Sequence, residues 1–267
     1  MQSFKSFILE VQNKGVEYEN LIKKKIRTIV KDYDNISIKR SVGKGSFSAH
    51  DVDLSLNINK KTYNIEMKKT ASEQMSGISF QFDKNKNDFI ITPKNLSKLD
   101  DETMEILKAG VSAKKSSVNK LLDFFEKNDP VWEYNKIKGF PLKVSRDEWI
   151  KAKNKNMVKN INLAIKYNAE FINKIYAKKK VNYIQLGKSG LFYMNDNPLK
   201  LPIPQLSGNI DIEFRATPSG VKKDKTHNVD YATVMLRLQG RLKFKGKSTL
   251  SLDNDKDIKK IFDILKE

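Results

Sequence analysis

Apolar and polar residues alternate along residues 51–68, which read DVDLSLNINKKTYNIEMK. Side chains in a strand point to opposite faces with a period of two, so this pattern predicts two short strands. Asn59-Lys60 separates them as a polar turn. Asn favours such a turn because it tolerates positive φ. The segment therefore predicts a β-hairpin with a turn at Asn59-Lys60.

The register of this hairpin predicts a site on one face. Folding about the turn pairs Leu54 with Ile65 and gives a continuous apolar face. The same register pairs Asp53 with Glu66 on the opposite face, where Lys68 also points. Directly opposed carboxylates repel each other. We therefore expect a cation between them, and Mg²⁺ is suited to oxygen ligands of this kind.

These residues carry a family resemblance. Asp53, followed by Glu66-Met67-Lys68 on the next strand, resembles the D…(D/E)xK signature of the PD-(D/E)XK, or restriction-endonuclease-like, nuclease superfamily. The stretch from Gly15 to Glu19 is similar to the G-x-x-aromatic-E pattern of many members. Residues 73–83 resemble the Gln-containing stretch that often follows the Lys. The resemblance covers roughly the first third of the chain.

The resemblance implies a role for each matched residue. Asp53 and Glu66 hold one or two Mg²⁺ ions, Lys68 positions or activates the attacking water, and Glu19 assists the metal. Gln74 is a candidate contact to substrate or water. The chain departs from the pattern because no Pro precedes the Asp, which leaves Asp51 as an alternative ligand. We favour Asp53, because the alternation begins immediately after it.

Two plainer interpretations stand beside these roles. An amphipathic hairpin with a solvated polar face has the same alternation, and a chain with 31% charged residues matches D…ExK easily by chance. Glu19 lies at the edge of an apolar helical stripe, where an ordinary surface Glu is equally at home, and Glu17 is the alternative on the next flank.

The remaining pattern divides the chain into three segments. Residues 1–93 are the amino-terminal part of the core, with a helix over residues 4–30 and strands beyond the hairpin. Residues 94–180 are a basic helical insertion in which Ser145 caps a helix that runs toward Lys180. Residues 181–267 are a β-rich portion that ends in an amphipathic helix. We expect the three segments to form one integrated domain.

Composition points to a polyanionic partner. The 267 residues include 51 Lys and Arg against 32 Asp and Glu, a net charge of +19. Such a surplus favours nucleic acid, through phosphate neutralisation and counterion release. There is no Cys and there are only two His, so a metal is expected to be oxygen-bound, as Mg²⁺ or Mn²⁺. The chain shows no apolar run long enough for a membrane span and no secretory signal, which favours a cytoplasmic protein.

Basic residues in the second and third segments are candidate DNA contacts. Between Lys151 and Lys180 the only acid is Glu170, a strongly one-sided distribution that fits phosphate contact. The candidates for DNA binding are Lys151, Lys153, Lys155, Lys159, Lys243 and Lys245. Asp211 and Glu213 share a strand face and form a weaker rival metal pair.

Together these features predict an α/β fold, a restriction-endonuclease-like core with a central mixed sheet flanked by helices. The expected function is a Mg²⁺-dependent DNA endonuclease, restriction-type or phage-encoded, and a homodimer is left open. The alternatives are a non-catalytic DNA-binding protein with a nuclease-like fold, or a nuclease for RNA or branched DNA. Replacing Lys68 by Ala is expected to leave the fold intact, because the apolar face of the hairpin is untouched.

Overall fold

The computed structural model describes residues 4–39, 52–70, 75–92, 99–135, 140–243 and 246–266. The chain forms two compact units. Unit 1 comprises residues 1–75, 167–210 and 241–267, and unit 2 comprises residues 76–166 and 211–240. The predicted segments 1–93, 94–180 and 181–267 therefore do not coincide with the compact units, because the chain passes between the units more than once.

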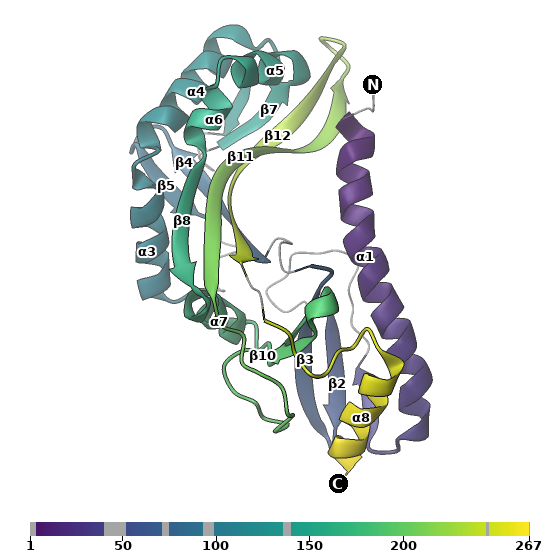
Figure 1. The fold of residues 1–267 in the computed structure, drawn as a ribbon. Helices are drawn as coiled ribbons and strands as arrows, with labels where there is room; N and C mark the ends of the chain where they lie inside the picture. The colour runs from purple at the N-terminus through teal and green to yellow at the C-terminus, as the bar shows by residue number, and fades with distance from the viewer. Residues whose placement is uncertain are drawn as a thin grey trace. The chain divides into compact units, whose positions relative to one another are not determined.

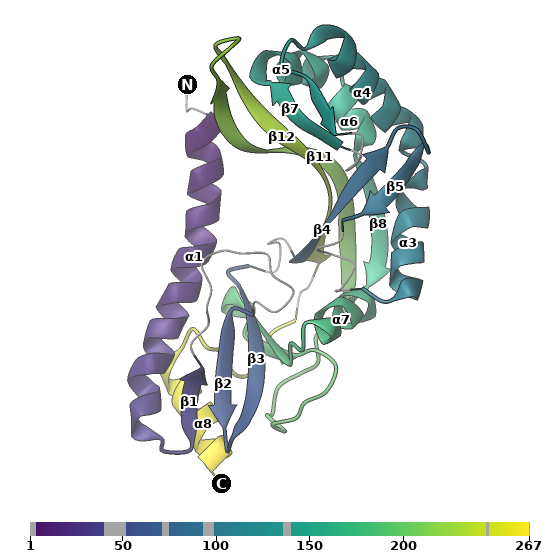
Figure 2. The same ribbon diagram turned by 180° about the vertical axis from the view of Figure 1, so that it is seen from behind.

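Unit 1 contains a five-stranded mixed sheet with strand order β1-β2-β3-β9-β10. β1, β2 and β3 are consecutive antiparallel neighbours and lie side by side in Figure 2. β9 then pairs parallel to β3, and β10 pairs antiparallel to β9. The strands are β1 (Ile36–Lys39), β2 (Leu54–Ile58), β3 (Lys61–Lys68), β9 (Tyr183–Leu186) and β10 (Leu191–Tyr193).

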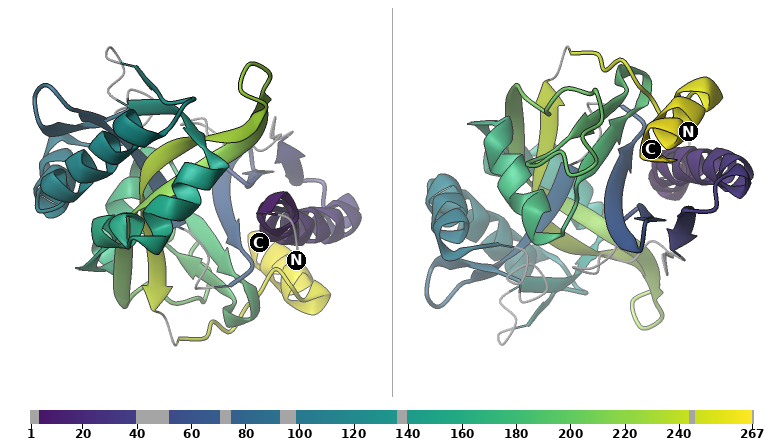
Figure 3. Two further views of the ribbon diagram at one scale, coloured as in Figure 1. Left: turned by 90° about the horizontal axis from the view of Figure 1, so that it is seen from above. Right: turned by 90° about the horizontal axis from the view of Figure 1, so that it is seen from below.

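Among the described residues of unit 1, three helices accompany this sheet: α1 (Phe4–Ile29), α7 (Ala169–Lys178) and α8 (Asp255–Lys266). α1 is continuous through Gly15 and contacts both β3 and α8, and Figures 1 and 3 show α8 lying along it. One hydrophobic core joins Ile22 and Ile26 of α1 to Leu54 of β2 and Phe262 of α8, all almost fully buried. The core fixes the hairpin because one face of β2 and β3 is buried in it. Two short 3₁₀ turns, η1 (Val30–Asp32) and η2 (Gly187–Ser189), complete the unit.

Unit 2 is built on the second sheet, with strand order β5-β4-β12-β11-β8, and β7 pairs with both β6 and β12. Figure 1 shows α3 and α4 along one side of this sheet. An edge-to-face cluster of Phe80, Phe89 and Phe214 forms part of its core. The strands are β4 (Met75–Asp83), β5 (Asp88–Ile91), β6 (Glu133–Asn135), β7 (Phe140–Ser145), β8 (Leu163–Asn168), β11 (Asn209–Asp224) and β12 (Val229–Lys243); the helices are α3 (Asp101–Ser112), α4 (Lys115–Asn128), α5 (Arg146–Asn154) and α6 (Met157–Ile161).

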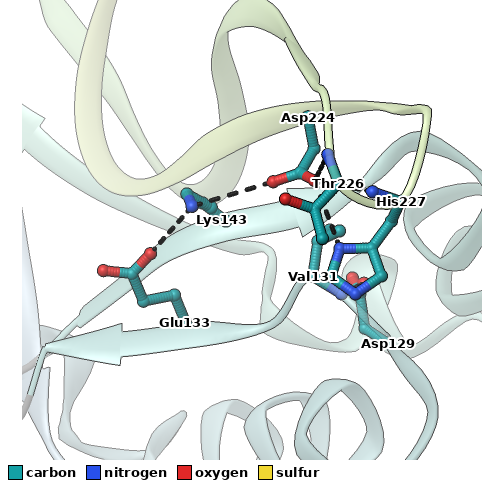
Figure 4. Close-up of polar contacts among 7 residues, drawn as sticks. All are labelled: Asp129, Val131, Glu133, Lys143, Asp224, Thr226 and His227. Carbon is teal, nitrogen blue, oxygen red and sulfur yellow. Dashed lines mark hydrogen bonds and ion pairs between the residues drawn. The ribbon is translucent and has the colours of Figure 1, made fainter.

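The turn between β11 and β12 is held by Asp224 (Figure 4). Its Oδ1 accepts hydrogen bonds from the backbone N–H groups of Thr226 and His227, at 3.0 and 2.9 Å. Its Oδ2 lies 3.8 Å from Lys143 Nζ, and that ammonium also pairs with Glu133 at 3.2 Å. These contacts are those of an Asp that shapes a turn through its own backbone neighbours.

The helix predicted to run from Ser145 toward Lys180 is wrong beyond its start. Ser145 does cap α5, accepting from the Glu148 N–H, as the sequence predicts. The chain then takes a left-handed conformation at Asn156, with φ of 58°, which ends the helix. α6, β8 and α7 follow as separate elements, so residues 94–180 are not purely helical.

Aromatic residues of this region pack in the core of unit 2. The rings of Trp132 and Trp149 stack with Phe125, at centroid distances of 5.7 and 6.2 Å.

No helix within the described ranges has both the length and the apolar composition that crossing a bilayer requires.

Candidate functional site

The hairpin of β2 and β3 has the predicted register. Leu54 pairs with Ile65, and Leu56 pairs with Tyr63. Asn59 and Lys60 form the turn with φ of 50° and 67°. Two successive positive φ values are those of a type I′ turn, whose twist matches that of the flanking strands. The turn thus places Asp53, immediately before β2, beside Glu66 on β3.

The part of the polar face that carries Ser55 and Glu66 is covered, whereas Thr62 near the turn is exposed. Glu66 is only 6% exposed and Ser55 8%. The hydroxyl of Tyr176, a fully buried residue of α7, donates a hydrogen bond to Glu66 Oε1 at 3.4 Å. A carboxylate at such a place is costly unless it is paired. The solvated polar face of the alternative interpretation therefore holds at Thr62 and does not hold at Glu66.

Lys68 joins the two carboxylates. Its Nζ donates to Glu66 Oε1 at 2.6 Å and lies 3.8 Å from Asp53 Oδ2. Asp53 Oδ2 also accepts a hydrogen bond from the Met67 N–H at 2.7 Å, which fixes the carboxylate across the strands. The side chains of Asp53 and Lys68 keep 20% and 15% exposure, so solvent reaches the group from one side.

One lysine does not neutralise two buried carboxylates. Burial and the Glu66 carboxylate raise the pKa of Asp53 from its ordinary 3.8 to about 7, although Lys68 opposes them. Burial acts to raise the pKa of Glu66 as well, but Lys68 and Lys179 outweigh it and the pKa is lowered. Burial acts to lower the pKa of Lys68, yet the two carboxylates raise it well above its usual value. Asp53 thus changes its protonation state near neutral pH.

Glu19 joins the same group electrostatically from α1. Burial raises its pKa, while Lys23 and Lys68 act to lower it and Glu66 acts to raise it. Its carboxylate pairs with Lys23 at 3.7 Å. Glu17, the alternative on the next flank of the helix, is exposed. Of the two helix carboxylates, Glu19 is the one that belongs to the site.

Sequence reasoning missed two members of the site, Tyr176 and Lys179. Both come from α7 and the residue that follows it, and the Lys179 ammonium lies 5.1 Å from the centroid of the Tyr176 ring. The Tyr176 hydroxyl contacts Glu66, and Lys179 acts to lower the pKa of Glu66. Nothing in the local pattern distinguishes these two residues from others of a Lys-rich run.

The other predicted site residues lie elsewhere. Gln74, Lys245 and the alternative ligand Asp51 are outside the described residues, and so is the side chain of Lys243. The remaining four lysines are exposed residues of unit 2, namely Lys151, Lys153, Lys155 and Lys159.

Two of those lysines are engaged within unit 2. Lys151 pairs with Glu148 at 2.5 Å, and Lys155 lies over the Phe124 ring at 5.1 Å. The rival metal pair, Asp211 and Glu213, also belongs to unit 2, where Glu213 lies 3.6 Å from Arg215. None of these contacts contributes to the group around Asp53.

Within the described ranges, no three His, Cys, Asp or Glu side chains come together as a ready-made metal cluster. No protein-family model, curated protein or solved structure matches the chain.

Proposed function

We propose that the protein is a metal-dependent endonuclease that hydrolyses DNA phosphodiester bonds. The observation that carries the proposal is the meeting of Asp53 and Glu66 across the hairpin, with the Lys68 ammonium 3.8 Å from an Asp53 oxygen and 2.6 Å from a Glu66 oxygen. Perturbed titration of grouped, partly buried side chains is typical of functional sites. The net charge of +19 supports a polyanionic substrate.

We also propose that unit 1 is a restriction-endonuclease-like core. In its support, a mixed sheet carries the D…ExK residues on adjacent antiparallel strands, and the next strand, β9, is parallel to β3 and reached through α7. Glu19 of α1 lies in electrostatic reach of Lys68, as the resemblance implies.

The residues present fit Mg²⁺ or Mn²⁺. Both candidate ligands are carboxylates, and burial together with the neighbouring Glu66 carboxylate raises the pKa of Asp53 despite Lys68. Mg²⁺ binds proteins through one or two carboxylates and keeps several waters, so a third protein ligand is unnecessary. When bound, such an ion polarises a phosphoryl oxygen and lowers the pKa of a bound water.

The chain's own residues would position these partners. The Met67 N–H orients Asp53, and Lys68 and Lys179, with a smaller contribution from the Tyr176 hydroxyl, lower the pKa of Glu66 and favour its ionised form. Lys68 keeps its proton, because its pKa is raised well above the usual value. It therefore acts as a fixed positive charge that stabilises the negative charge developing on the phosphate, rather than as a general base.

A cleavage assay tests the proposal. Supercoiled, linear and branched DNA and a structured RNA are incubated with the protein in Mg²⁺, in Mn²⁺ or in EDTA. We expect metal-dependent cleavage of DNA that falls by roughly 10²–10³-fold in Lys68→Ala, the range for loss of one preorganised electrostatic contact.

Lys61→Ala is the matched control, because Lys61 is an exposed residue of the same strand and its substitution removes the same charge. It should cut as the parent does. A parent that binds DNA but cuts no substrate with either ion would reject the enzyme in favour of a non-catalytic DNA-binding protein. Preferential cleavage of RNA or branched DNA would correct the substrate class.

A further inference from the structure

A pocket of about 610 Å³ opens in unit 1 beside the candidate site, at the ends of two parallel strands. β3 and β9 run parallel, with Lys68 opposite Leu186, and the residues that follow each strand line the pocket. These are Lys69 and Thr70 after β3, and Gly187 to Ser189 after β9. In α/β sheets, ligands bind outside the carboxyl ends of parallel strands.

The pocket wall is held rigidly. Gly187 has φ of 42°, and a Cβ there would lie 1.9 Å from the Lys69 carbonyl oxygen, so the two strand ends are in direct contact. The Gly190 N–H bonds to the Gly187 carbonyl at 3.2 Å, and the Ser248 N–H bonds to the Ser189 carbonyl at 2.7 Å. A wall fixed by backbone contacts is preformed, as small-ligand sites usually are.

The lining combines apolar surface with cations. α1 contributes Tyr18 and Leu21, a leucine that is 53% exposed. Lys69 and Lys188 bring positive charge, and Asp253 supplies one carboxylate. An aromatic and apolar wall suits a planar base, lysines suit a phosphate, and a carboxylate accepts from an exocyclic amino group.

The pocket also adjoins the candidate site along the chain. Tyr18 precedes Glu19, and Lys69 follows Lys68. We propose that this pocket binds a single nucleotide, its base against Tyr18 and Leu21 and its phosphate at Lys188. Where the source is a nucleic acid, the occupant is an unpaired nucleotide next to the bond that is cut, and that part rests on the proposed function.

Calorimetric titration in EDTA tests binding without cleavage. The probes are the four deoxynucleoside 5′-monophosphates, a single-stranded tetranucleotide and inorganic phosphate. We expect saturable binding of at least one mononucleotide, tighter binding of the tetranucleotide, and much weaker binding of phosphate alone. A mononucleotide that binds as tightly as the tetranucleotide would identify a free nucleotide as the ligand, and the pocket assignment would stand.

Lys188→Ala and Leu21→Ala alter exposed side chains and should each weaken mononucleotide binding, roughly tenfold for the loss of the charged contact. Lys60→Ala, at the exposed hairpin turn, is the charge-matched control and should bind as the parent does. Absence of mononucleotide binding, or equal affinities in the parent, Lys188→Ala and Leu21→Ala, would overturn the inference.

The two proposals fail in different ways. Asp53→Asn should lose cleavage and keep nucleotide binding, because Asp53 does not line the pocket. A protein that binds nucleotides but cuts no substrate would refute the endonuclease proposal and support the nucleotide pocket. A protein that cuts DNA with no nucleotide affinity in this pocket would do the reverse.

Discussion

Asp53 should destabilise the metal-free protein at neutral and alkaline pH. Burial and Glu66 raise its pKa from 3.8 to about 7. A raised carboxylate pKa means that the folded state binds the proton more tightly than the unfolded state. Its stabilising contribution is therefore complete below about pH 3.8 and is lost as the pH rises through 7.

The size of this loss follows from linkage. A shift of about 3 units, at roughly 1.4 kcal/mol each, amounts to about 4 kcal/mol over the whole titration. Roughly 2–3 kcal/mol of it falls between about pH 5 and pH 8. Asp53→Asn resembles the protonated acid and keeps an acceptor for the Met67 N–H. The stability of Asp53→Asn relative to the parent should therefore be greater at pH 8 than at pH 5, by roughly 2–3 kcal/mol.

The assay is urea unfolding in EDTA at both pH values, followed by far-UV circular dichroism. Both tryptophans, Trp132 and Trp149, lie in unit 2, so their fluorescence reports that unit separately. Asp34→Asn, which changes an exposed carboxylate in unit 1, is the control and should show no such gain. Adding Mg²⁺ at pH 8 should stabilise the parent more than Asp53→Asn, by mass action on the native state. An equal stability difference between parent and Asp53→Asn at the two pH values would refute the claim that Asp53 is held in an unfavourable ionised state.

Three further outcomes are expected. Lys68→Ala leaves Glu66, which is 6% exposed, without its nearest cation. The free energy of unfolding in EDTA should therefore fall by about 3–5 kcal/mol and recover in part when Mg²⁺ is added. A stability equal to that of Lys61→Ala would contradict this expectation. Duplex DNA affinity of Asp53→Asn, measured by fluorescence anisotropy, should fall steeply between about 50 and 200 mM salt, and a flat response would exclude an electrostatic interface. Gly187→Ala places a Cβ 1.9 Å from a carbonyl oxygen, so its free energy of unfolding in urea should fall by about 1–3 kcal/mol. In the control Gly15→Ala the new Cβ meets no atom within 4 Å, and the free energy of unfolding should rise by up to about 1 kcal/mol. Equal stabilities of the two variants would argue against the close approach at Gly187.

The hairpin could be predicted because its signals are local. Alternation with a period of two sets the faces, and Asn59-Lys60 sets the turn, so the pairing of Leu54 with Ile65 follows from adjacent residues alone. The coarse α/β class follows in the same way from helical and alternating stretches. The order of the strands in space does not, since β3 and β9 are separated by a long stretch of chain and no local pattern specifies their parallel pairing.

The surroundings of the site could not be predicted for the same reason. Tyr176 contacts Glu66 although 110 positions of sequence separate them. Because the sequence predicts one helix from Ser145 toward Lys180, it does not predict α7, which carries Tyr176, as a separate element. Asn156 could have indicated the break, because Asn tolerates the left-handed conformation, but the surrounding residues suit a helix. The expectation that Lys68→Ala leaves the fold intact considered only the apolar face. The ion pair with a buried Glu66 changes it to an expected loss of stability.

The interleaving of the two units has a consequence for folding during synthesis. α1 is made before its partner α8, which follows more than 200 residues later, and β3 is made long before β9, with which it pairs. Unit 2 is complete once Gly240 has been made, before α8 exists. We expect the unit that begins later to fold first, while the apolar side of α1 stays uncovered on the ribosome. Such exposed apolar surface is what chaperones recognise and what favours aggregation.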